Sequence, residues 1–324
     1  MSGARREVDV AELVERARTG DARAVARLIT LVESAGDPPI LRAVAAALAP
    51  FGGRAHVVGL TGSPGVGKST TTSAVIGVLR AQGRRVGVLA VDPSSPFSGG
   101  ALLGDRVRMA EHATDDGVFI RSLASRGQLG GLAAAVPQAL RVLDAAGYEV
   151  VLIETVGVGQ AEFEIASLAD TTIVLLAPGM GDGIQAAKAG ILEIADVFVV
   201  NKADRDGAAT LARDMRHLVK LGGARTDSAF WRPPILKTIA AQGEGIEAVV
   251  EAVSTHHDWL VEHGELDQRR HRRAAAEIEA IAVGTIRARF GSVHGSSALD
   301  AAAAAVMSGR SDPFAAADEL VAGL

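Results

Sequence analysis

The chemistry with the clearest signal in this sequence is phosphate binding. Residues 62–69 match the pattern G-x-x-x-x-G-K-S of a phosphate-binding loop. The glycines let backbone N–H groups turn toward a phosphate chain where a Cβ atom would clash. Lys68 supplies a mobile positive charge for the β- and γ-phosphates, and the Ser69 hydroxyl is a ligand for Mg²⁺. The predicted phosphate site comprises Gly62, Ser63, Pro64, Gly65, Val66, Gly67, Lys68, Ser69 and Thr70.

A second motif is typical of residues that recognise the base of a bound nucleotide. Residues 201–204 read Asn-Lys-Ala-Asp and follow the apolar run 197–200, which we interpret as a strand. In this position the Asp204 carboxylate can accept hydrogen bonds from guanine N1–H and the exocyclic amine, donors that adenine lacks at that edge. The pattern therefore favours GTP over ATP, with Asn201, Lys202 and Asp204 at the base. Thr238, Ile239 and Ala240 follow another strand, where a backbone N–H can contact guanine O6.

Two acidic residues end apolar strands near the phosphate loop. Glu154 is expected to hold Mg²⁺ through a water molecule, opposite Ser69; an ordinary strand-end acid is the alternative. Asp92 is expected beside the γ-phosphate, where it can orient the attacking water or hold a metal-bound water; a turn-forming Asp before Pro93 is the alternative. Lys68, Asp92 and Glu154 are thus the candidate catalytic residues.

The segment 177–183 is glycine-rich and follows another strand at the same edge of the expected sheet. Asp182, Gln185 and Lys188 lie three residues apart, so they share one face of a helix that begins near residue 183. We interpret these three residues as part of a nucleotide-dependent switch. A solvated polar face is the alternative.

Composition narrows the class of protein. The 324 residues are 48% hydrophobic, carry a formal net charge of −5 and include no cysteine. The absence of cysteine excludes disulfides, thiolate zinc sites and a cysteine nucleophile. The negative net charge does not favour a nucleic-acid binder. The sequence shows no signal-peptide pattern, and no apolar run reaches the roughly 18 residues of a membrane span. We therefore expect a cytoplasmic protein.

The order of apolar runs predicts an α/β fold. Strands are expected at 56–60, 86–91, 118–120, 150–153, 172–177, 197–200 and 234–236, with helical patterns between them. Because most of these runs are apolar throughout, they indicate a mostly parallel sheet covered by helices on both faces. We expect a helical extension over 1–50, a P-loop domain over 51–255 and a helical arm over 256–324. The arm is expected to form a dimer interface, with a surface appendage as the alternative.

With these motifs in place, the chain resembles the methylmalonyl-CoA mutase-associated GTPases of the MeaB type, also catalogued as ArgK or LAO/AO transport system ATPases. The resemblance rests on V-D-P-S-S-P-F-S-G-G-A-L-L-G-D-R-V-R-M at 91–109, E-T-V-G-V-G-Q at 154–160, the loop at 178–190 and N-K-A-D, in that order. It implies a homodimeric P-loop GTPase of the SIMIBI class that acts as a chaperone for adenosylcobalamin-dependent methylmalonyl-CoA mutase. It also implies that Asp92, Asp105 and Glu154 surround the Mg²⁺ and that 178–190 is a switch that senses nucleotide.

Two other functions remain open at this point. One is an ATP-dependent kinase or ATPase linked to amino-acid transport, against which N-K-A-D and the lack of an apolar span argue. The other is a metallochaperone GTPase, against which the absence of cysteine and the scattering of only 8 histidines argue. No D-x-H-x-x-G cobalamin signature occurs in the chain, which suggests that the corrinoid is held by the partner.

Overall fold

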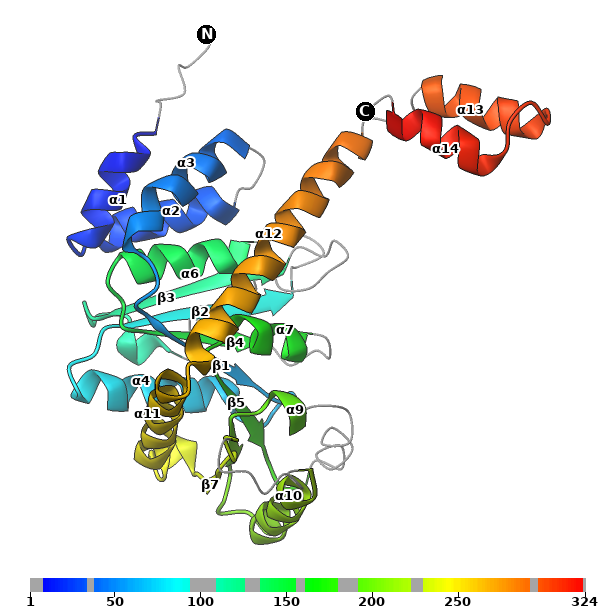
Figure 1. Ribbon diagram of the computed structural model, residues 1–324. Helices are drawn as coiled ribbons and strands as arrows, with labels where there is room; N and C mark the ends of the chain where they lie inside the picture. The colour runs from blue at the N-terminus through cyan, green and yellow to red at the C-terminus, as the bar shows by residue number, and fades with distance from the viewer. Residues whose placement is uncertain are drawn as a thin grey trace. The chain divides into compact units, whose positions relative to one another are not determined.

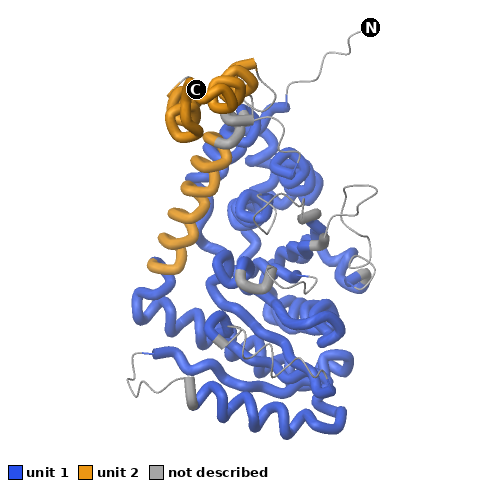
Figure 2. Tube along the Cα trace, turned by 90° about the vertical axis from the view of Figure 1, so that its right-hand side faces the viewer, with its two compact units in different colours: residues 1–267 blue, residues 268–324 orange. Residues whose placement is uncertain are grey.

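The computed structural model describes residues 8–33, 38–93, 109–125, 135–155, 161–179, 192–222, 230–291 and 297–322. These residues belong to two compact units, 1–267 and 268–324, coloured separately in Figure 2. The expected boundaries at residues 50 and 255 remain predictions.

The first unit is built on a sheet of seven described strands in the order β3-β2-β4-β1-β5-β6-β7 (Figure 1). All pairings between neighbouring described strands are parallel, which confirms the predicted sheet. The strands are β1 (His56–Thr61), β2 (Val86–Pro93), β3 (Val118–Ser125), β4 (Val150–Thr155), β5 (Thr171–Leu176), β6 (Val197–Val200) and β7 (Ile235–Lys237).

β3 is longer than the apolar run that predicted it. Arg121 and Ser122 interrupt the run, yet their backbones pair with Leu89 and Ala90 of β2. Arg121 is tolerated because its guanidinium donates to Thr30 Oγ1 at 3.2 Å and to the Glu33 carboxylate, both on the helix that covers this strand. A partner in tertiary structure therefore extends the strand beyond its sequence pattern.

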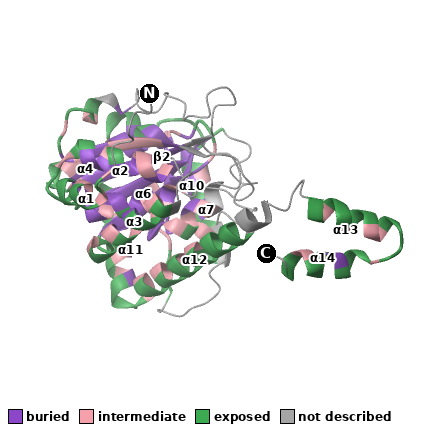
Figure 3. Cartoon of the chain, turned by 90° about the horizontal axis from the view of Figure 1, so that it is seen from above, coloured by how far each residue is buried: buried purple, intermediate pink, exposed green. Residues whose placement is uncertain are grey.

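Helices cover both faces of the sheet. The described helices of the first unit are α1 (Val10–Arg18), α2 (Ala22–Glu33), α3 (Pro38–Leu48), α4 (Lys68–Ala81), α6 (Ala135–Ala145), α7 (Ala161–Leu168), α9 (Leu192–Ile194), α10 (Ala208–Gly222) and α11 (Ile246–Glu262). Short 3-10 turns lie at Ala49–Phe51, Ala110–His112 and Ala240–Gln242. Buried residues of the first unit gather in its interior, and the outward sides of its helices are mostly exposed (Figure 3).

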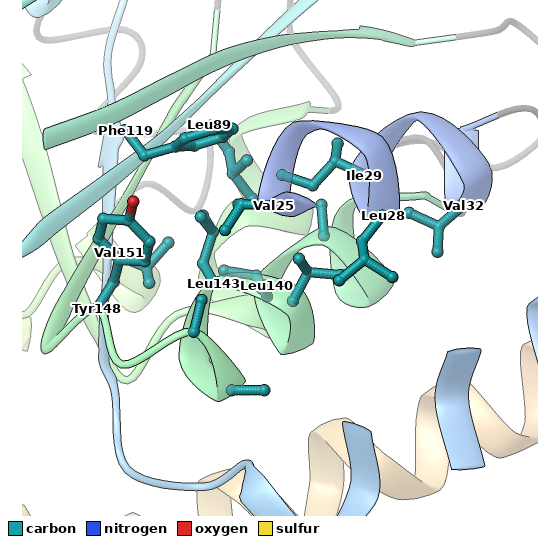
Figure 4. Close-up of a cluster of buried hydrophobic side chains, with 14 of the residues drawn as sticks. Val25, Leu28, Ile29, Val32, Leu89, Phe119, Leu140, Leu143, Tyr148 and Val151 are labelled. Atoms are coloured by element: carbon teal, nitrogen blue, oxygen red, sulfur yellow. The ribbon is translucent and has the colours of Figure 1, made fainter. Parts of the chain in front are cut away.

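The N-terminal helices share a core with one face of the sheet. Val25, Leu28 and Ile29 of α2 pack in one buried cluster with Leu143 of α6 and Leu89 of β2 (Figure 4). On the opposite face, α4 and α11 pack over β1, β4 and β5 in a second cluster. The N-terminal helices therefore pack on α6 and the sheet, and β1 lies between the two clusters.

The second unit is helical, as the sequence predicts. α12 (Glu265–Gly291) begins in the first unit and continues into the second, and α13 (Ser297–Met307) packs against α14 (Pro313–Ala322). α12 exposes a set of aliphatic residues, with Ile278 at 68%, Ile281 at 56% and Ile286 at 55% exposure. None of the described helices combines the length and apolarity needed to cross a membrane.

Candidate nucleotide-binding site

The phosphate loop joins the carboxyl end of β1 to the first residue of α4, as its sequence predicts. Gly62, Gly65 and Gly67 have φ angles of 144°, 81° and 99°, in the region that favours glycine. A Cβ atom at Gly62 would lie 2.3 Å from the Leu175 carbonyl oxygen, and one at Gly67 would lie 2.4 Å from Asn201 Nδ2. Because α4 starts at Lys68, its first backbone N–H groups have no partner within the helix and favour an anion.

Lys68 and Ser69, the first two residues of α4, both contact groups outside that helix. The Lys68 ammonium donates to the carbonyl oxygens of Gly62 at 2.6 Å and Ser63 at 3.1 Å, so it lies across the loop. The Ser69 hydroxyl donates to Glu154 Oε1 at 2.5 Å, and both side chains are buried. The sequence separates these two residues by 85 positions, and the structure brings them into direct contact.

The contact between Ser69 and Glu154 fits a magnesium ion. Mg²⁺ prefers hard oxygen donors and usually retains several waters, and a serine hydroxyl beside a carboxylate supplies such oxygens. Among the described residues, no three His, Cys, Asp or Glu side chains gather into a ready-made metal cluster. A pair of protein oxygens is nevertheless sufficient for a metal that also binds substrate phosphates.

Other predicted residues are placed only in part. The backbone of Asp92 lies near the end of β2, in register with Ala124, and the preceding Val91 pairs with Thr155 of β4. Asp92 therefore lies on the strand next to that of Glu154, at the same edge of the sheet. Asp105, and the expected switch residues Asp182, Gln185 and Lys188, lie outside the described residues.

Asn201 connects the two sequence motifs. Its Nδ2 donates to the Val66 carbonyl oxygen in the phosphate loop at 2.9 Å. Its Oδ1 accepts hydrogen bonds from Thr238 Oγ1 and from the Ala240 backbone N–H, both at 3.1 Å. The buried amide therefore uses both ends to hold the phosphate loop beside the segment 238–240.

The other residues of the base motif lie beside the same loop. Lys202 has a φ angle of 56°, and its ammonium donates to the Gly65 carbonyl oxygen at 2.6 Å. Asp204 is exposed in the turn that follows.

The backbone N–H groups of the segment 238–240, expected to contact guanine O6, make hydrogen bonds within the chain. The backbone N–H groups of Thr238, Ile239 and Ala240 donate to the Val200 carbonyl, the Glu244 carbonyl and Asn201 Oδ1 respectively. All three expected donors for guanine O6 are thus already used within the chain. The segment's observed contacts hold Asn201, and its contact with the base stays a prediction.

Sequence reasoning missed two buried hydroxyl groups at the carboxyl edge. Thr61 and Thr155 directly follow the register pair Leu60 and Glu154, and both are almost fully buried. Within the described residues, neither hydroxyl oxygen has a hydrogen-bond partner. A buried unpaired hydroxyl costs about 1–3 kcal/mol, so the two residues mark this edge as a place where polar groups are retained. The sequence could have indicated both threonines, because Thr61 precedes the phosphate loop and Thr155 follows Glu154 directly.

The fold and the site define a P-loop nucleotide hydrolase with a guanine-type base motif. The model of the family "Methylmalonyl Co-A mutase-associated GTPase MeaB" matches residues 25–293. The chain belongs to this family and is a GTPase.

Individual relatives agree with the family assignment. A putative GTPase of Pyrococcus horikoshii is 45% identical over 95% of this chain and 96% of its own length. The mouse protein "Methylmalonic aciduria type A homolog, mitochondrial" is 41% identical over 66% of this chain and 52% of its own length. The crystal structure of a LAO/AO transport system kinase has a TM-score of 0.69 and 28% identity, covering 98% of both chains.

Proposed function

We propose that this GTPase binds methylmalonyl-CoA mutase and gates the loading and protection of its adenosylcobalamin cofactor. The observation that carries the proposal is the family match over residues 25–293, whose description names an association with this mutase. The name of the mouse relative, which refers to methylmalonic aciduria, supports the same metabolic context for that protein. A cytoplasmic location is part of the proposal.

The site residues receive roles from their contacts. Lys68 lies over the phosphate loop and is proposed to neutralise charge on the β- and γ-phosphates during hydrolysis. Ser69 would hold Mg²⁺ directly, and Glu154 would hold it through water, because their oxygens already meet at 2.5 Å. The metal would supply charge stabilisation for the phosphates. Asp92 and Asp105 are proposed to complete this environment, with Asp92 orienting the attacking water.

Base selection is proposed to depend on Asp204, with Asn201 in a positioning role. Asn201 has both ends of its amide engaged by the phosphate loop and the segment 238–240, so it holds the two walls of the site together. Lys202 crosses from the base motif to Gly65 and can cover one face of the base. This division of roles predicts GTP and GDP as ligands.

The partner is tested by GTP turnover with and without purified methylmalonyl-CoA mutase. We expect the mutase to accelerate hydrolysis, and Lys188→Ala to remove the acceleration while the intrinsic rate stays near that of the parent. Lys220→Ala is the matched control, because Lys220 is an exposed lysine on α10. Equal rates with and without mutase, in the parent and in both variants, would contradict the proposed partner.

An ATP-dependent kinase linked to amino-acid transport is the second candidate, because the similar solved structure carries the name of a transport system kinase. Competition between guanine nucleotide and ATP for the same site distinguishes the GTPase from the ATP-dependent kinase. A GTPase with the base motif described here should retain GDP in the presence of a large excess of ATP. Displacement of GDP by equimolar ATP would favour the kinase.

We also propose a homodimer formed through the second unit. Ile278, Ile281 and Ile286 expose apolar side chains along α12, and such surfaces on soluble proteins commonly contact a partner. Ile281→Glu is expected to convert dimers to monomers, measured by light scattering at micromolar concentration. The conservative variant Ile281→Val should remain dimeric. A parent protein that is monomeric under these conditions would rule out the dimer.

A further inference from the structure

A cavity of about 640 Å³ lies at the opposite edge of the sheet from the nucleotide motifs. It is bordered by residues at the amino ends of the strands, including His56 of β1 and Val150 of β4. Its volume falls within the range of small-molecule sites, about 300–1,000 Å³. No motif recognised in the sequence accounts for it.

The interior of the cavity is apolar. Its walls are two helices that pack side by side over the sheet, α4 and α11 (Figure 1). The residues that these helices and the sheet contribute are buried aliphatic side chains: Val58, Val75, Leu79, Leu152, Ile173, Val249, Val250 and Val253. Val75, Leu79, Val250 and Val253 keep 3–9% exposure, so they supply the apolar surface that an aliphatic or aromatic ligand body would contact, and the other four lie behind them.

The rim of the cavity carries both arginines and carboxylates. Three arginines border it, Arg18, Arg54 and Arg84. Arg18 is paired with Glu15 at 2.9 Å, and Arg84 lies 3.8 Å from Glu149. For Arg54 no ion pair or side-chain hydrogen bond occurs within the part of the chain that the structure describes. One exposed guanidinium is therefore available at the rim.

The three carboxylates at the rim, Asp144, Glu149 and Asp258, balance the three arginines in number, but none of them pairs with the Arg54 side chain among the described residues. The Asp144 carboxylate accepts from the backbone N–H groups of Gly53, Arg54 and Ala55, so both of its oxygens are engaged. The side chain of Asp258 is 86% exposed and extends into solvent. A ligand carboxylate would therefore find its partner in the single guanidinium of Arg54, and not in a rim of net positive charge.

One wall of the cavity includes the polar ring of His56, which buried polar side chains hold in position. His56 Nε2 lies 2.8 Å from Thr171 Oγ1, which in turn lies 2.8 Å from His256 Nδ1. His256 is fully buried, and its Nε2 lies 3.2 Å from Asp196 Oδ1. At the cavity, the ring of His56 contacts that of His257 with centroids 4.4 Å apart. Such a preorganised polar group beside an apolar chamber is typical of ligand sites.

We propose that this cavity is an effector site for a small organic anion with an apolar body, and that its occupancy changes the affinity for guanine nucleotide. Both walls lead to the nucleotide site: α4 starts in the phosphate loop at Lys68, and α11 starts at Ile246, directly after the loop that holds Asn201. A ligand between the two helices can therefore shift both loops. Linkage requires that nucleotide alter effector affinity by the same factor.

The test uses octanoate as the probe, with 1-octanol as the uncharged comparison. Calorimetry on the full chain should detect saturable binding of octanoate and weaker binding of 1-octanol. Saturating octanoate should change the GDP dissociation constant several-fold. Arg54→Gln should weaken octanoate about tenfold, the effect of losing one charge-assisted hydrogen bond of about 1.4 kcal/mol, and should leave 1-octanol unchanged.

Two further variants separate the cavity from the rest of the surface. Val253→Trp should fill the chamber and remove both octanoate binding and its effect on GDP. Val261→Trp is the matched control on the same helix, because Val261 is 56% exposed and does not line the cavity. Arg213→Gln is the control for Arg54, since Arg213 is exposed on α10.

Absence of saturable octanoate binding would overturn the proposal. So would equal octanoate affinity in Arg54→Gln and the parent, or a GDP affinity that octanoate leaves unchanged. GDP binding without octanoate is measured in every arm. Its absence in the parent would contradict the proposed nucleotide site, which is a separate result from failure of the effector site.

Discussion

The Asn201 side-chain amide donates to the Val66 carbonyl oxygen at 2.9 Å, although 135 residues separate the two in the chain. This hydrogen bond ties the segment after β6 to the phosphate loop after β1. The same amide accepts from Thr238 and Ala240, so one buried side chain joins three loops at the carboxyl edge of the sheet. The base motif and the phosphate motif are therefore one structural unit.

Removing this amide should damage both stability and binding. Asn201→Ala leaves the Val66 carbonyl and the Ala240 N–H buried without their partner, at a cost of about 1–3 kcal/mol for each group. We expect a lower free energy of unfolding in urea and a GDP affinity reduced at least tenfold by calorimetry. Thr238→Val removes only one of the contacts and should lose less of both. Parent-like values in Asn201→Ala would show that the bridge contributes nothing.

The pairing of Ser69 with Glu154 predicts a specific dependence on magnesium. Glu154→Gln keeps the size of the side chain but removes the charge beside the Ser69 hydroxyl. GTP turnover at fixed Mg²⁺ should fall at least tenfold, and the Mg²⁺ concentration for half-maximal turnover should rise. Glu247→Gln on exposed α11 surface is the control. If both variants show the parent's Mg²⁺ titration, Glu154 has no role at the metal.

Asp204 provides a test of base recognition. Asp204→Asn replaces two acceptor oxygens by an amide, whose NH₂ can face the 2-oxo group of xanthine. GTP should bind more weakly, by about 1–3 kcal/mol for an unpaired polar group, and XTP should bind more tightly than it does to the parent. Asp206→Asn, a neighbouring exposed aspartate, is the control. Unchanged GTP affinity by calorimetry would remove Asp204 from the base pocket.

The start of β3 predicts a pH effect on stability. Arg80 donates to both oxygens of Asp115, and hydrogen bonding to this guanidinium lowers the pKa of the Asp115 carboxyl below its usual value. A depressed native pKa means that the stabilisation is present above the unfolded-state pKa, about 3.9, and is lost as pH falls through the native pKa. The difference in unfolding free energy between the parent and Asp115→Asn should therefore be largest near neutral pH.

This difference should shrink below about pH 4, where the unfolded-state carboxyl begins to take up its proton. Urea unfolding at several pH values measures it. Asp116→Asn, at the exposed neighbouring position, should show a small difference at every pH. A gap between the parent and Asp115→Asn that is constant from neutral to acidic pH would contradict the role of the ion pair.

The sequence by itself determined the elements and the ligand class. The strands of the sheet are apolar runs, and burial on both faces requires such runs wherever they lie, so their positions could be read directly. The phosphate loop was equally readable, because glycine at positive φ and lysine and serine at fixed spacing have few substitutes. The family followed from motifs in order along the chain.

Only the tertiary structure decided how those parts meet. Strand order sets which loops share an edge, and no local pattern records that β1 lies between β4 and β5. The contacts of Asn201 with Val66, and of Ser69 with Glu154, depend on that order. The length of β3 depends on partners that Arg121 finds on α2. The cavity between α4 and α11 arises where two helices imperfectly fill the space over the sheet. Each of these features involves segments that are far apart in the chain. Tertiary packing brings the segments together, and no local sequence pattern predicts that they meet.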